Sequence, residues 1–181
     1  MANKKITDLT ELTEAASDDY LEIVDTSANT SKKISYGNLI DANAGTWQPY
    51  TVSWTAATTN PSIGNGTLIG RYTQIGKTCI LVIGLTMGST TTYGSGNWSF
   101  GLPKTAKNTT GINFYGVAHI RKAGTANYER IAQISPKVST TVINAFIDPT
   151  PGSNSFNISA TVPFTWGDGD ALGFQITYEM E

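Results

Sequence analysis

The sequence has few of the residues from which catalytic and metal sites are built. Among its 181 residues there is one histidine, His119, and one cysteine, Cys79. One cysteine cannot form an internal disulfide, and a zinc site built on cysteine and histidine needs about four such ligands. Cys79 lies in the apolar run 79–83, which predicts a buried and unreactive thiol. We therefore expect no metal site of this kind and no cofactor.

Charge is also scarce and nearly balanced. Only 14% of the residues are charged, and the formal net charge is −2. Such a chain has no positive field to attract nucleic acid or an anionic membrane. No apolar run approaches the roughly 20 residues that span a bilayer, and the residues after Met1 lack the apolar core of a secretory signal. We expect a protein made in a cytoplasm, with no nucleic-acid partner and no membrane insertion.

What the chain does have is a strong pattern of strands and turns. Its 18 glycines and low charge are typical of an all-β protein with many turns. The clearest stretch is a hairpin over 67–86, in which Gly76 supplies the positive φ of the turn. Because 79–83 is apolar at every position, we expect that strand to be buried on both faces.

Residues 47–181 contain nine candidate strands separated by polar, glycine or proline turns. Their number and spacing predict a β-sandwich or barrel, and open sheet edges favour an oligomer. The candidate strands are 49–55, 67–75, 77–86, 97–101, 113–122, 127–135, 139–147, 156–163 and 172–179.

The four tryptophans fall into two pairs. Trp54 and Trp98 lie in alternating strand patterns, which predicts core positions. Trp47 and Trp166 lie near the ends of segments. For these two, a core or subunit contact and a carbohydrate platform both remain open.

The first forty residues differ from the rest in charge. They hold four lysines and seven acids, whereas 41–181 hold eight bases and seven acids. This shift predicts an N-terminal arm over 1–40, a linker over 41–46 and a body over 47–181. Strand patterns at 20–25 and 32–36 indicate a hairpin in the arm. The hairpin has too few apolar residues to be stable alone, so we expect a partner surface or other copies to complete it.

Motifs in both segments resemble proteins of tailed bacteriophages. In the arm, residues 5–9, 19–25 and 32–39 resemble an N-terminal module of fibres, spikes and decoration proteins that attaches to the particle. The body has further motifs at 50–54, 65–72, 76–77, 98–103 and 166–170, which are similar to C-terminal domains of phage tail and surface proteins. The resemblance implies a jelly-roll type of sandwich, commonly trimeric, located in the virion.

These observations predict a non-enzymatic structural protein of a phage virion, made in the host cytoplasm. We expect a homotrimeric head-decoration, cement or spike protein that binds other virion proteins through its arm. The apolar residues expected to make this attachment are Ile6, Leu9, Leu12, Tyr20, Leu21, Ile23, Ile34 and Leu39. An alternative is a short tail fibre or receptor-binding tip that recognises a glycan or protein of the host surface. A second alternative is an envelope-polysaccharide hydrolase, which needs two carboxylates about 5–10 Å apart.

Four candidate sites have simpler interpretations beside the functional one. Asp168 and Asp170 form a weak calcium candidate, but Asp-Gly is also a common turn sequence. A nucleophile pair of Cys79 and His119 is possible only if the fold brings them together. The loop 88–96, tipped by Tyr93, and the stiffer loop that begins at Asp148 are candidates for recognition. Ordinary solvated loops remain the alternative.

Overall fold

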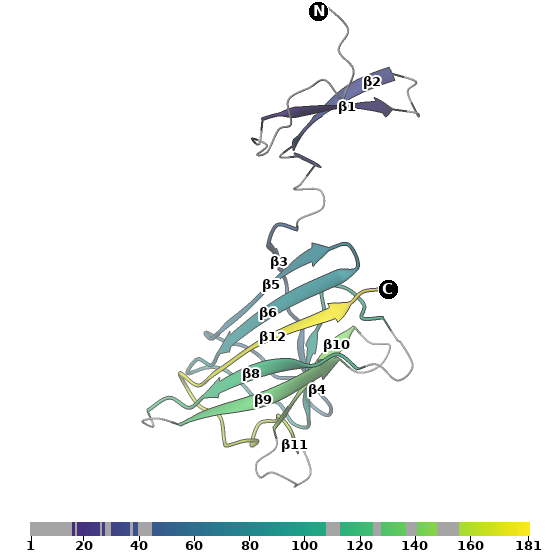
Figure 1. The fold of residues 1–181 in the computed structure, drawn as a ribbon. Helices are drawn as coiled ribbons and strands as arrows, with labels where there is room; N and C mark the ends of the chain where they lie inside the picture. Colours follow the sequence, from purple (N-terminus) through teal and green to yellow (C-terminus); the bar gives the residue numbers. More distant parts are fainter. Residues whose placement is uncertain are drawn as a thin grey trace, which may run out of the picture. The chain divides into compact units, whose positions relative to one another are not determined.

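The chain forms two compact units of β structure (Figure 1). The computed structural model describes residues 16, 18–25, 27, 30–36, 38–39, 45–107, 113–124, 128–136, 141–147 and 156–181. The N-terminal unit is Met1–Gly45 and the body is Thr46–Glu181. The division between them falls inside the segment 41–46 that the sequence suggests as a linker.

The N-terminal unit contains an antiparallel hairpin of β1 (Tyr20–Asp25) and β2 (Thr30–Ser35). Leu21 lies opposite Ile34, and Glu22 lies opposite Lys33 on the other face. Tyr20 and Leu21 are nevertheless exposed. A two-stranded hairpin that covers so little apolar surface is marginally stable in water by itself.

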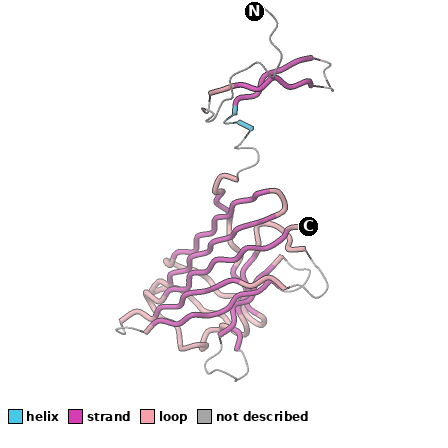
Figure 2. The backbone as a smooth tube through the Cα atoms, in the orientation of Figure 1, coloured by secondary structure: helices cyan, strands magenta, loops and turns pink. Residues whose placement is uncertain are grey.

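Ten strands of the described body form one antiparallel sheet, drawn in magenta in Figure 2. They are β3 (Gln48–Tyr50), β4 (Trp54–Ala56), β5 (Thr67–Ile75), β6 (Thr78–Thr86), β7 (Trp98–Gly101), β8 (Gly116–Arg121), β9 (Glu129–Pro136), β10 (Val142–Ile147), β11 (Phe156–Asn157) and β12 (Ala171–Glu179). The order across the sheet is β3-β5-β6-β12-β8-β9-β10-β7-β4, and β11 pairs with β10. The all-β prediction is confirmed.

The sheet curls through β9 and β10 until β7 lies across the core from β12. Phe100 of β7 and Phe174 of β12 are four steps apart in the strand order, yet their ring centroids are 5.2 Å apart. Trp54 and Trp98 are buried in the same core, as predicted, and Trp166 packs on Trp98 at 5.2 Å. The two layers therefore enclose one aromatic core, as in a sandwich.

The central hairpin of β5 and β6 forms as expected, with Gly76 at φ 56° in its turn. The expectation that β6 is buried on both faces is wrong. Cys79, Leu81, Ile83 and Leu85 point into the core, whereas the alternate positions Ile80 and Val82 are only half-buried. One face of β6 packs on the core, and the other belongs to the outside of the sheet.

Two predicted strands differ from the structure. The segment 49–55 divides into β3 and β4, which lie at opposite ends of the strand order. The segment 156–163 contributes only the two-residue strand β11, followed by isolated bridges at Ser159. The strand order alone does not establish the jelly-roll type, which stays a prediction. In the described part of the chain, no helix has the length and apolar character needed to span a membrane.

Candidate functional site

Three loops of the body gather at one end of the sandwich, opposite the β5–β6 turn. Met180 donates a backbone hydrogen bond to Lys77 in the β5–β6 turn, so the C-terminal residues lie at that turn. β3, the first strand of the body, pairs with the middle of β5, with Gln48 opposite Tyr72. The segments 57–66, 88–97 and 167–170 adjoin the other ends of these strands. We call these three segments the loop end.

Two segments of the loop end hold each other in place. Asn65 donates its backbone N–H to the Thr90 hydroxyl at 2.9 Å, and its side-chain oxygen accepts from the Thr90 backbone N–H at 2.9 Å. Backbone bridges join Thr59 to Ser95 and Ser62 to Thr92. The recognition loop expected at 88–96 is therefore braced by 57–66, a partner that sequence reasoning missed.

Glycine permits the close approach of these two segments. A Cβ atom at Gly94 would lie 2.1 Å from the Thr59 carbonyl oxygen, and one at Gly64 would lie 2.5 Å from the Thr90 carbonyl oxygen. Both glycines also have positive φ, 61° and 56° respectively. Their backbones fit only without a side chain. The signal in the sequence was the glycine content of both segments, but nothing local showed that they meet.

Tyr93 is half-buried in the braced loop, and its carbonyl oxygen accepts a 2.9 Å hydrogen bond from the indole N–H of Trp98. Burial raises the pKa of the Tyr93 phenol, and the charges of Asp170 and Asp168 raise it further. The segments 57–66 and 88–97 contain no charged residue. They present hydroxyl, amide and backbone groups on a preorganised surface.

Asp170 has a structural role in the loop end. Its carboxylate accepts hydrogen bonds of 2.7 Å from the backbone N–H groups of Ala123 and Gly167, and the Lys122 ammonium lies 3.5 Å away. Asp168 is exposed on the same turn. An ammonium group beside the carboxylate disfavours a second cation there. Among the described residues, no group of three or more His, Cys, Asp or Glu side chains could hold a metal ion.

Cys79 and His119 point to opposite faces of the sheet. Cys79 faces the core with 0% exposure, whereas His119 on β8 lies on the outside and its imidazole is 3.2 Å from Glu129. Burial raises the pKa of the Cys79 thiol, which keeps it protonated. The structure therefore does not bring this nucleophile pair together, and the prediction of a buried thiol is confirmed.

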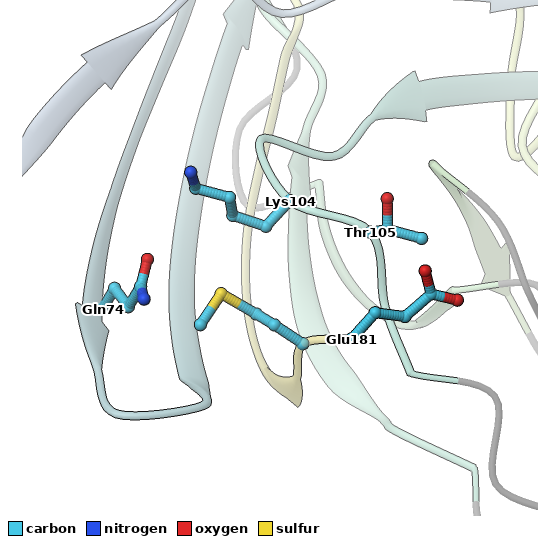
Figure 3. Close-up of a pocket in the computed structure, with 5 residues that line it drawn as sticks. Gln74, Lys104, Thr105 and Glu181 are labelled. Carbon is cyan, nitrogen blue, oxygen red and sulfur yellow. The ribbon is translucent and has the colours of Figure 1, made fainter.

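A shallow pocket of about 280 Å³ lies at the opposite end of the body from the loop end. Its lining residues are Gln74, Lys104, Thr105, Met180 and Glu181 (Figure 3). The Lys104 ammonium and the Glu181 carboxylate point in different directions. Without converging polar groups, this pocket is a weaker candidate than the loop end.

The residues expected to attach the chain to a particle are partly described. In the hairpin, Tyr20 and Leu21 are exposed, and the Lys33 ammonium lies 4.1 Å from the Tyr20 ring centroid. Ile34 and Leu39 are half-buried, and Ile23 pairs in register with Lys32. The structure does not describe the remaining attachment candidates, Ile6, Leu9 and Leu12. The loop candidate Asp148 also lies outside the described residues.

The chain is similar to the Mu-like prophage FluMu defective tail fiber protein of Haemophilus influenzae strain Rd. The two are 33% identical over 134 residues, and the match covers 72% of this chain and 20% of the relative. The chain thus spans about a fifth of the length of this curated relative. No model of a known protein family matches the chain, and no solved structure matches it. The similarity supports a structural protein of a bacteriophage, associated with the virion.

Proposed function

We propose that this chain is a non-enzymatic tail-fibre protein whose body presents the loop end to the host surface. The observation that carries the proposal is the similarity to a prophage tail fibre protein over 134 residues. This similarity favours the tail-fibre alternative over the head-decoration, cement or spike role that the sequence first suggested.

Two of the three loop-end segments have the chemistry of a surface that binds uncharged sugars, and the third, 167–170, carries the exposed charge of Asp168. The segments 57–66 and 88–97 expose Thr, Ser and Asn side chains and no charge. Hydroxyl and amide groups can each donate and accept, as sugar hydroxyls do. Because Asn65, Thr90 and the backbone bridges already hold these segments together, little conformational entropy is lost on binding. We therefore propose a neutral glycan of the host envelope as the receptor.

The N-terminal unit supplies the attachment in this proposal. Its exposed Tyr20 and Leu21 lie on a hairpin that is marginal by itself, and packing against another virion protein would cover them. Several copies would strengthen the attachment through effective concentration. The resemblance to phage surface proteins suggests three copies of the chain.

The proposal is tested by binding of the fluorescently labelled full chain to the bacteria that the phage infects. We expect the chain to bind and to compete with particle adsorption. Periodate oxidation of the cell-surface sugars should abolish the binding, while protease treatment of the cells should not. Absence of binding to cells that adsorb the phage would contradict the proposal. Loss of binding after protease treatment but not after periodate would mean that the receptor is a protein and not a glycan.

A matched pair of substitutions locates the surface. Thr58 and Thr78 are both exposed, but Thr58 lies in the loop end and Thr78 lies beside the β5–β6 turn at the opposite end. Thr58→Arg should weaken cell binding by adding charge and bulk to the neutral surface. Thr78→Arg should leave binding unchanged. The reverse result would place recognition at the other end of the body.

A further inference from the structure

Asn65 and Gly66 form the single Asn-Gly pair in the sequence, and this is the dipeptide most prone to lose its side-chain amide. In that reaction the backbone nitrogen of the glycine loses its proton and attacks the Cγ atom of the asparagine. The new C–N bond closes a cyclic imide, and the side-chain nitrogen leaves as ammonia with the proton that the glycine lost. Water then opens the imide at either carbonyl, which gives aspartate or isoaspartate. Glycine favours the attack because it has no Cβ atom to hinder it.

Close packing fixes glycine at position 66. A Cβ atom there would lie 2.6 Å from the Thr86 carbonyl oxygen and 2.9 Å from the Gly88 backbone nitrogen, closer than side chains approach such atoms. The loop end therefore cannot exchange this glycine for a bulkier residue that would slow the reaction at Asn65.

Hydrogen bonds restrain both groups that must meet in the reaction. The side-chain oxygen of Asn65 accepts from the backbone N–H and the hydroxyl of Thr90 at 2.9 and 3.0 Å, and its amide nitrogen donates to the Ser89 hydroxyl at 3.0 Å. The attacking nitrogen is held as well, because the Gly66 N–H donates to the Ile63 carbonyl oxygen at 2.9 Å. A backbone N–H in such a bond exchanges its proton slowly until the local structure opens. We call the bonds of Asn65 with Thr90 and Ser89 the brace.

Burial does not supply this protection. Asn65 is exposed and Gly66 is half-buried, so water can reach the pair in the folded protein. Three hydrogen bonds join Asn65 to Thr90, since the Asn65 backbone N–H also donates to the Thr90 hydroxyl. Separation of the segments 57–66 and 88–97 would remove these bonds together. The stability of the brace therefore sets how often the reactive geometry can form.

We propose that Asn65 is a modification site controlled by the brace, which deamidates when the segments 57–66 and 88–97 separate and is preserved while they are joined. Isoaspartate adds a methylene group to the backbone beside Gly66, where the packing leaves no room. Aspartate adds a charge to two segments that carry none. Because ammonia is lost, either product changes the loop end permanently. Any loss of cell binding that follows rests on the proposed function.

Peptide mass spectrometry of the full chain, incubated in mildly alkaline buffer, tests the proposal without a receptor. We expect Asn65 to lose its amide at least about tenfold more slowly in the folded protein than in guanidinium chloride, since a factor of ten needs only about 1.4 kcal/mol of protection. Equal rates in the two states would overturn the proposal. An Asn65 amide that stays intact in the unfolded chain would also overturn it.

Substitutions at Thr90 test whether the brace is the cause. Thr90→Val removes the hydroxyl that bonds Asn65, so the deamidation rate should rise several-fold, whereas Thr90→Ser keeps the hydroxyl and should keep the wild-type rate. Thr78→Val is the control at the opposite end of the body. A folded Thr90→Val that deamidates no faster than Thr78→Val would overturn the control by the brace. Ser89→Ala, which removes only the partner of the amide nitrogen, makes the same comparison if Thr90→Val does not fold.

The modified chain tests the consequence for the loop end. Ion exchange separates chains that carry isoaspartate at position 65 from unmodified chains, because the product has an additional negative charge. We expect the modified fraction to melt at a lower temperature and to bind the bacteria more weakly. An unchanged melting temperature would overturn the loss of bracing. Absence of binding by the unmodified chain would contradict the proposed function and leave the modification site standing.

Discussion

The carboxylate of Asp170 accepts a 2.7 Å hydrogen bond from the backbone N–H of Ala123 and thereby joins the residues that follow β8 to the loop end. Its second oxygen accepts from Gly167 at 2.7 Å. Asp170→Ala would leave these donors without partners, at a cost of about 1–3 kcal/mol for each that stays buried. We expect the free energy of unfolding to fall by that order, measured by urea denaturation.

The matched control for this change is Asp168→Ala on the same turn. Asp168 is exposed, so its removal should change the free energy of unfolding by no more than about 0.5 kcal/mol. Addition of calcium or of a chelator should not alter either melting curve. Equal destabilisation by the two substitutions, or a calcium-dependent rise in melting temperature, would refute the structural role of Asp170.

Neighbouring positions of β6 should respond differently to the same charge. Leu81 is fully buried in the core, whereas Val82 is half-buried on the outside of the sheet. Leu81→Asp places an unpaired charge in the aromatic core and should abolish cooperative folding. Val82→Asp should leave a folded body with a clear melting transition. Loss of folding in both variants would mean that β6 is covered on both sides even in a single body.

Two glycines with similar φ allow the bracing of the loop end to be measured. Gly76 and Gly94 have φ of 56° and 61°, but only Gly94 has a neighbour, the Thr59 carbonyl oxygen, where a Cβ would be. Gly76→Ala should cost about 1–2 kcal/mol from the backbone alone. Gly94→Ala should cost more, and it should weaken cell binding because the two segments must separate. Thermal unfolding and the cell-binding assay check this, and equal costs would contradict the bracing.

Alkaline pH should destabilise the body through its buried phenols and thiol. Burial raises the pKa of Tyr178, and its contact with Cys79 raises it further. Unfolded chains lose these protons near the ordinary values of 9.0 for Cys79 and 10.0 for Tyr178, while the folded protein keeps them. The unfolded state then binds fewer protons, so stability is full below about pH 9 and falls as the pH rises. Between about pH 8 and about pH 11, the melting temperature of Tyr178→Phe should fall less steeply than that of the wild type. Equal slopes would refute a contribution of the Tyr178 phenol to the loss of stability at alkaline pH.

The parts of the fold that depend on local pattern were predictable. The hairpin of β5 and β6, its turn at Gly76 and the core positions of Trp54 and Trp98 follow from alternation and turn chemistry. The division of 49–55 into β3 and β4 was not predictable, because it depends on which distant strands they pair with. Local alternation carries no information about pairing across the sheet.

The candidate site shows the same limit. The loop around Tyr93 could be selected from its composition, but its bracing by 57–66 is a contact between distant segments. The apolar residues at both parities of β6 indicated two covered faces, although the body covers only one.

The central claim is that this chain belongs to the tail of a phage, and its position on the particle tests that claim most directly. Intact particles of the phage that encodes it would be labelled with gold-conjugated antibodies against the body and imaged by electron microscopy. The account predicts gold on the tail fibres, at the part of the particle that contacts the host. Gold distributed over the head would contradict it and would restore the decoration role.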